Sequence, residues 1–121
     1  MGNVGVGVDV VDVPRFELAL QRHPRLIDRL FTTSEQDDAS KRPERLAARF
    51  AAKEAVLKTL GVGIGATPWK SIEVQKSASG APHVVLHGEA QELATQLGIR
   101  DLLLSMSHTD TTAIAFVVGS N

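Results

Sequence analysis

The order of apolar and polar positions divides the 121-residue chain into strand-like and helix-like segments. Small and apolar residues alternate over residues 4–13 and stop at Pro14, which predicts a first β-strand. Residues 69–88 predict two strands joined by a Ser-Gly turn. Two more strands are predicted within residues 99–120, with their junction near residues 107–110.

The segments between these strands have helical spacing. They are residues 14–31 with an interruption at Pro24, a short segment that begins near Thr33 or Ser34, residues 43–60, and residues 88–98. Helices and strands in this order predict an α+β fold, with helices packed on a largely antiparallel sheet. The length of the chain predicts a single domain over residues 1–121.

Composition narrows the class of protein. The chain has no cysteine, which excludes disulfides, thiolate metal sites and a cysteine nucleophile. Its net charge of −1 argues against bulk binding of nucleic acid. No apolar run is long enough to span a bilayer, and residues 1–10 lack the pattern of a signal peptide. We therefore expect a cytoplasmic protein that binds neither nucleic acid nor membranes.

The predicted long helix carries acids, cations and alanines on different faces. At about 100° per residue, Leu46, Phe50 and Leu57 form one apolar stripe, which we expect to face the sheet. Glu54 and Lys58 share a neighbouring arc with alanines, whose small side chains leave room for a ligand. An ordinary i,i+4 ion pair on a solvated helix is the simpler interpretation of these two residues.

A second acid makes this helix more informative. Asp9 lies in an apolar strand, on one face with Gly7 and Val11, where a carboxylate is unfavourable unless it is paired or bound to a cation. One strand acid, one helix acid and nearby cations suit Mg²⁺-assisted chemistry on a phosphorylated ligand. The spacing leaves open whether Asp9 and Glu54 meet.

Three glycines, Gly61, Gly63 and Gly65, follow the long helix. A phosphate-binding loop of the P-loop or dinucleotide type precedes its helix, and the chain has no Gly-Lys-Ser/Thr sequence at this point. The glycines therefore predict a loop, a helix C-cap or a place of close backbone approach.

The motifs GVGVDVVDVPRF, LFTTSE, ARFAAKEAVLKTLGVGIG, SGAP and LSMSHTDTTAIAFVV occur in that order along nearly the whole chain. In this order they resemble the motifs of the bacterial holo-[acyl-carrier-protein] synthases, the small 4′-phosphopantetheinyl transferases. The resemblance implies an enzyme that transfers the phosphopantetheine arm of coenzyme A to a serine of an apo acyl carrier protein. It releases adenosine 3′,5′-bisphosphate, requires Mg²⁺, for which Mn²⁺ can substitute, and supports fatty acid biosynthesis.

The resemblance also implies roles for individual residues. The family's magnesium ligands fall on Asp9 and Glu54, and its phosphate-binding lysine falls on Lys58. The serine proton could be taken by Glu54, or through a water molecule by Glu35, for which an acid placed at a helix start is the competing interpretation. The positions expected around coenzyme A are Arg49, Lys53, Lys58, Gly61, Gly63, Gly65 and His108.

The resemblance further predicts the partners of the chain. Family members are typically homotrimers with a site in each cleft between subunits, which suits a chain too small to enclose coenzyme A alone. Carrier proteins are acidic and dock on the basic first helix, where Arg15, Arg22, Arg25 and Arg29 recur at intervals of seven, three and four. A solvated basic stripe is the simpler interpretation. The carrier is either a free protein or a domain of a fatty acid synthase.

Two other functions compete with the enzyme. A non-catalytic module that binds nucleotides or coenzyme A would use the same cations, but it would gain nothing from the carboxylates of Asp9 and Glu54 without a metal. A structural trimer or interaction domain would carry its charges only on solvated faces.

Overall fold

The structure is a computed structural model that describes residues 2–121. Its helices are α1 (Val13–Arg22), α2 (Leu26–Leu30), α3 (Thr33–Asp38), α4 (Pro43–Thr59) and α5 (Gly88–Gln96), with a short 3₁₀ helix at Trp69–Ser71. Its strands are β1 (Asn3–Asp12), β2 (Ile72–Lys76), β3 (Pro82–Leu86), β4 (Asp101–His108) and β5 (Thr112–Ser120). Each predicted strand and helix is confirmed, including the break at Pro24 between α1 and α2.

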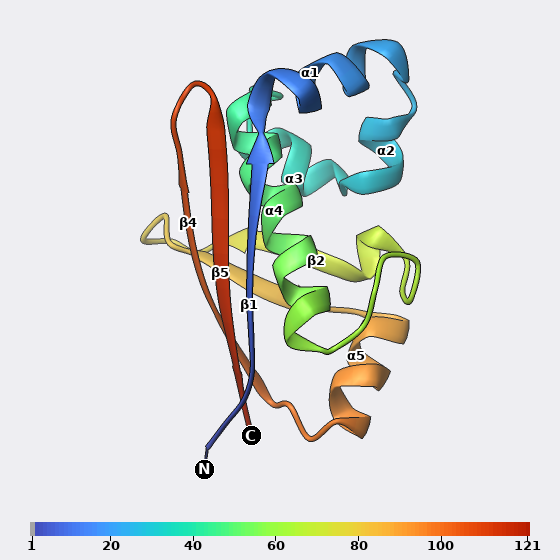
Figure 1. Ribbon diagram of the computed structural model, residues 1–121, viewed down its shortest axis with the longest axis vertical. Coiled ribbons are helices and arrows are strands. Elements are labelled where there is room, and N and C mark those ends of the chain that lie inside the picture. The colour runs from blue at the N-terminus through green and yellow to red at the C-terminus, as the bar shows by residue number, and fades with distance from the viewer. Residues whose placement is uncertain (1) are drawn as a thin grey trace.

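The strands form two antiparallel sheets. One sheet has three strands in the order β1-β5-β4, so β1 and β4 are its edges, and the other consists of β2 and β3. The helices lie on one side of the three-stranded sheet, and the β2–β3 hairpin crosses beside α4 (Figure 1). This arrangement is the predicted α+β fold with helices on an antiparallel sheet.

Helix α4 packs on β1 and β5 through its smallest residues. A Cβ atom added to Gly7 would lie 2.0 Å from the carbonyl oxygen of Ala55, and one added to Gly5 would lie 2.4 Å from that of Thr59. The glycines of β1 therefore allow the helix backbone to approach the strand directly. They serve packing within the chain.

The prediction that the stripe with Leu46, Phe50 and Leu57 faces the sheet is wrong. Phe50 instead stacks on Phe16 of α1, with ring centroids 5.3 Å apart, and contacts Trp69 at 5.1 Å. Ala47 and Ala51, the alanines on the arc of Glu54 and Lys58, are fully buried, so they do not leave room for a ligand there. Because α4 is packed between the sheet and the other elements, it is buried on nearly all faces, and its small residues take the sheet side.

The other face of the three-stranded sheet is apolar and exposed. Val6 and Val10 on β1 are 58% and 60% exposed, Phe116 on β5 is 45% exposed and Leu103 on β4 is 67% exposed. Val6 and Leu103 both pair with Val118, so these side chains adjoin across all three strands. A continuous apolar sheet face of this kind is typical of a surface that another protein covers.

No helix within residues 2–121 combines the length and the apolar character needed to cross a membrane.

Candidate active site

Asp9, Glu54 and Lys58 come together at the contact between β1 and α4. Asp9 lies on the same face of β1 as Gly7 and Val11, as predicted, and this face turns toward the helix. Lys58 Nζ lies 3.1 Å from Asp9 Oδ1 and donates a hydrogen bond of 2.8 Å to the carbonyl oxygen of Val8. Within residues 2–121, the ion-pair partner of Lys58 is therefore Asp9 and not Glu54, so the simple i,i+4 interpretation is wrong.

The charges at this contact do not balance. Burial and then the charge of Asp9 raise the pKa of Glu54, while the charge of Lys58 acts in the opposite direction. The one ammonium group pairs with Asp9 alone, so the nearby carboxylate of Glu54 leaves an excess of negative charge that favours binding of a further cation. Carboxylate oxygens are ligands that suit Mg²⁺.

The number of carboxylates also agrees with Mg²⁺. Residues 2–121 contain no group of three or more histidine, cysteine or acidic side chains placed to hold a metal. Mg²⁺ is commonly held by one or two carboxylates, with waters and substrate phosphates as its other ligands. Asp9 and Glu54 therefore fit a magnesium ion that is shared with a phosphorylated substrate.

A second part of the candidate site lies on the opposite side of α4. A cleft of about 270 Å³ is lined by Arg49 and His108 together with Arg45, Lys76, Asp38, Ala48, Pro82 and Met106. Arg49 is only 7% exposed, its Nη1 donates to the carbonyl oxygen of Arg45 at 3.2 Å, and its Nε has no partner among the described residues. Burial lowers the pKa of Arg49. A partly unpaired guanidinium that lines a cationic cleft is suited to an anionic ligand.

Two cationic residues of this cleft were not predicted from the sequence. Arg45 precedes Arg49 by one helical turn, and Lys76 ends β2 just before the SGAP turn. Arg49 is the residue that the motif marks, and Arg45 lies one helical turn before it. The helical period alone could therefore have indicated that Arg45 faces the same cleft. Lys76 reaches the cleft only because the β2–β3 hairpin folds beside β4.

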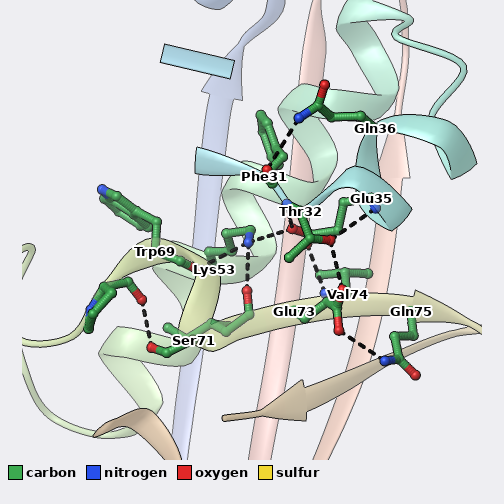
Figure 2. Close-up of polar contacts among 12 residues, drawn as sticks. Phe31, Thr32, Glu35, Gln36, Lys53, Trp69, Ser71, Glu73, Val74 and Gln75 are labelled. Carbon is green, nitrogen blue, oxygen red and sulfur yellow. Dashed lines mark hydrogen bonds and ion pairs between the residues drawn. The ribbon is translucent and has the colours of Figure 1, made fainter. Parts of the chain in front are cut away.

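Glu35 and Lys53 form an ion pair in the interior of the protein (Figure 2). Both side chains are fully buried, and Lys53 Nζ lies 2.8 Å from Glu35 Oε1. The ammonium also donates to the carbonyl oxygens of Ile72 at 2.6 Å and Trp69 at 3.1 Å. Burial lowers the pKa of Lys53 more than the adjacent Glu35 raises it.

The carboxylate of Glu35 has no free oxygen. Its Oε1 also accepts the backbone N–H of Thr32, and its Oε2 accepts that of Val74 at 2.9 Å. Thr32 and Glu35 form a capping box at the start of α3. This geometry fits the helix-start interpretation of Glu35 and gives neither side chain access to a ligand. The expected contacts of Glu35 with the serine proton and of Lys53 with coenzyme A have no support in the structure.

The glycine loop begins with a helix C-cap. Gly61 has a φ of 74°, and the N–H groups of Gly61 and Val62 bond to the carbonyl oxygens of Lys58 and Leu57. This is a Schellman motif, which requires a left-handed residue at Gly61. A Cβ atom added at Gly61, Gly63 or Gly65 would meet nothing within 4 Å, so the loop is open on its outer side.

The four arginines of the first helical segment are exposed, and Arg15 lines a different hollow from Arg25 and Arg29. Arg15 lines a shallow hollow with Glu54, Phe16 and Phe50. Arg25 and Arg29 line another with His23 and Leu26. The chain turns between α1 and α2, which separates the two groups (Figure 1).

Comparison with known proteins decides the family. The family model described as the 4′-phosphopantetheinyl transferase superfamily matches residues 5–117. A holo-[acyl-carrier-protein] synthase of Frankia casuarinae is 49% identical over 118 residues, which cover 98% of each chain. The chain belongs to this family.

Other holo-[acyl-carrier-protein] synthases support the same family assignment. The enzyme of Moorella thermoacetica is 45% identical over 112 residues, which cover 90% of this chain and 88% of the relative. The crystal structure of the Helicobacter pylori synthase in complex with coenzyme A superposes with a TM-score of 0.87 at 33% identity, covering 95% of this chain and 99% of the other. A member of this family is an enzyme, a phosphopantetheinyl transferase.

Proposed function

We propose that the chain transfers the 4′-phosphopantetheine arm of coenzyme A to a serine of an apo acyl carrier protein, releasing adenosine 3′,5′-bisphosphate. The observation that carries the proposal is the meeting of Asp9, Glu54 and Lys58 at the contact of β1 with α4. Relatives named as holo-[acyl-carrier-protein] synthases, one of them solved with coenzyme A, support the substrates. The reaction would serve fatty acid biosynthesis in the cytoplasm.

The residues of the site divide the work of binding and transfer. Asp9 and Glu54 would hold Mg²⁺, which when bound neutralises the charge on the pyrophosphate. Lys58 would bind a phosphate of coenzyme A and stabilise the charge that develops on the leaving bisphosphate. Arg49 and His108 would bind the remaining phosphate charge in the cationic cleft.

The serine proton must pass to a base within hydrogen-bond reach. Both oxygens of Glu35 are occupied by buried donors, so Glu35 is not part of the proposal. Glu54 is half-buried beside Arg15, on the side where the first helix would present the carrier. We therefore assign proton removal to Glu54, directly or through a water molecule.

Intact mass of the carrier protein tests this function. An apo acyl carrier protein incubated with the chain, coenzyme A and Mg²⁺ should gain the mass of one phosphopantetheine, and a variant carrier with alanine at the accepting serine should gain none. Unchanged mass in each of several free carriers and carrier domains would favour a non-catalytic module instead.

The active enzyme is proposed to be a homotrimer whose sites lie between subunits. Asp9 lies on β1 and His108 ends β4, and these strands are the opposite edges of one sheet. The outer face of that sheet is apolar and exposed, with Val10 and Leu103 at least 60% exposed. If these faces pack head-to-tail around a closed ring, the β1 edge of one subunit meets the β4 edge of the next. The carboxylates and the cationic cleft then border the same ligand.

Subunit mixing is expected to restore activity to two inactive variants. Glu54→Gln impairs one part of a composite site and His108→Ala impairs the other, so each pure trimer should have little activity. In randomly mixed trimers, about a quarter of the interfaces combine an intact Glu54 with an intact His108 from the neighbour. Co-refolded mixtures should therefore recover activity toward a quarter of that of the wild-type enzyme.

Mixing two preparations of the same variant is the control for refolding. If the mixture has only the mean activity of its two components, the residues act within one chain and the inter-subunit site is wrong.

Arg22→Glu is expected to raise the Michaelis constant for the carrier protein and to leave that for coenzyme A nearly unchanged. Arg22 is exposed at the end of α1, where its positive charge would attract an acidic carrier protein during docking. The effect should shrink as salt increases, because exposed charges are screened within about 10 Å at 0.1 M ionic strength. Steady-state kinetics at low and high salt measure both constants.

The matched control is Arg100→Glu, an exposed position next to the start of β4. An equal rise in both Michaelis constants for Arg22→Glu, or equal effects of the two variants, would remove α1 from the docking site.

A further inference from the structure

Lys58 holds a carboxylate that the proposed metal needs. Its ammonium lies 3.1 Å from Asp9 Oδ1 and 2.8 Å from the carbonyl oxygen of Val8, so the side chain crosses from α4 to β1. The Asp9 side chain is only 13% exposed, and no other salt bridge to it occurs within residues 2–121. The ammonium group of Lys58 therefore already pairs with the carboxylate to which the proposed metal would bind.

The pairing is easily exchanged. The Lys58 side chain is 54% exposed, so packing does not confine its ammonium group and water weakens the attraction to Asp9. Its flexible four-carbon stem lets the ammonium reach another anion without movement of the helix. The excess negative charge of Asp9 and Glu54 over one ammonium remains to attract an ion of higher charge.

We propose that Lys58 is the resident counter-ion of Asp9, that it leaves this carboxylate when a divalent ion binds, and that its ammonium then turns to the phosphates of coenzyme A. The inference rests on the proposed function and adds an exchange of partners to it. Lys58 and the divalent ion compete for Asp9 in the absence of coenzyme A. With coenzyme A present, the competition ends because the ammonium has a second anion to bind.

The exchange predicts that loss of the Lys58 charge raises the affinity for a divalent ion while it lowers turnover. Lys58→Met keeps most of the side-chain length and removes the charge, so the variant should bind a divalent ion more tightly than the wild-type enzyme although its turnover falls. A charge about 4 Å from a divalent ion changes its affinity substantially even in water, so we expect a gain of at least about tenfold.

Binding of Mn²⁺ measured by electron paramagnetic resonance of the free ion, without coenzyme A, tests the exchange. Lys70→Met removes the same charge from an exposed position on the 3₁₀ helix and should leave Mn²⁺ affinity within about twofold of the wild-type value. Lys58→Arg keeps the charge and should not show the gain of Lys58→Met. Circular dichroism and thermal unfolding check that each variant is folded.

Coenzyme A supplies the second measurement. In the wild-type enzyme, coenzyme A should tighten Mn²⁺ binding by a larger factor than in Lys58→Met, because it also removes the competing ammonium from Asp9. Tighter Mn²⁺ binding by Lys58→Met, together with this smaller coupling, supports the exchange. Unchanged or weaker Mn²⁺ binding by folded Lys58→Met overturns the exchange while the metal site stands. Absence of Mn²⁺ binding by both the wild-type enzyme and Lys58→Met, with and without coenzyme A, overturns the metal site and the exchange together.

Discussion

Glu54→Gln is expected to reduce phosphopantetheine transfer by at least about 100-fold and to leave the fold intact. The amide keeps the shape of the side chain but removes one of the two charges that would hold Mg²⁺ beside the pyrophosphate. Asp9→Asn should have an effect of the same order, because each carboxylate would contribute one of the protein's ligands to the metal. Initial rates measured over a range of Mg²⁺ concentrations give the loss for each variant.

The stability of Glu54→Gln should equal or exceed that of the wild-type enzyme at neutral pH. Burial and the charge of Asp9 raise the pKa of Glu54, so the folded protein binds this proton more tightly than the unfolded chain. The ionised form therefore lowers stability as pH rises through the raised pKa, and glutamine removes that cost. A site that sacrifices stability for function is expected to behave in this way.

Glu92→Gln, at an exposed position of α5, is the control for loss of an acid elsewhere and should retain full activity. A chelator should abolish transfer by the wild-type enzyme, and added Mg²⁺ or Mn²⁺ should restore it. Full activity of Glu54→Gln with a chelator present would contradict the assignment.

Lys53→Met is expected to lower the free energy of unfolding by about 3–5 kcal/mol. Glu35 would be left in a fully buried position without the ammonium that lies 2.8 Å from it. The carbonyl oxygens of Ile72 and Trp69 would lose a donor as well. Urea unfolding at equal protein concentrations measures the change, since assembly makes apparent stability depend on concentration.

The double variant Glu35→Gln/Lys53→Met separates the charge from the packing. Without either charge, part of the lost stability should return, because an unpaired buried charge accounts for much of the cost of the single change. Lys70→Met removes an exposed lysine and should change stability by no more than about 0.5 kcal/mol. If Lys53→Met is as stable as Lys70→Met, the buried pair does not hold α3 and β2 on α4.

The long helix illustrates the limit of a helical wheel. The wheel placed Glu54 beside Lys58, and this placement describes the angles of the two residues correctly. The wheel does not say which element covers each angle. Glu35 lies 18 residues from Lys53 in the chain, and Asp9 lies 49 residues from Lys58, so both partners depended on long-range packing.

The sequence by itself determined the elements, the family and which residues of β1 share a face. The alternation of apolar and polar residues and the helix ends at Pro24 and Gly61 depend on neighbouring residues alone. The positions of strands and helices could therefore be predicted without a tertiary structure. The same alternation placed Asp9 on one face of β1 with Gly7 and Val11, and the packing of α4 showed that this face is the inner one.

Tertiary structure alone decided which charged residues are buried and which groups share a site. Lys53 and Lys58 lie five residues apart on the same helix. The side chain of Lys53 is fully buried in an ion pair with Glu35, whereas that of Lys58 is exposed and pairs with Asp9. Their different surroundings arise because the β2–β3 hairpin and α3 cover one side of α4, while the glycines of β1 bring the sheet against another. The residue types and their spacing are compatible with either environment, and only the packing of distant segments assigns one to each lysine.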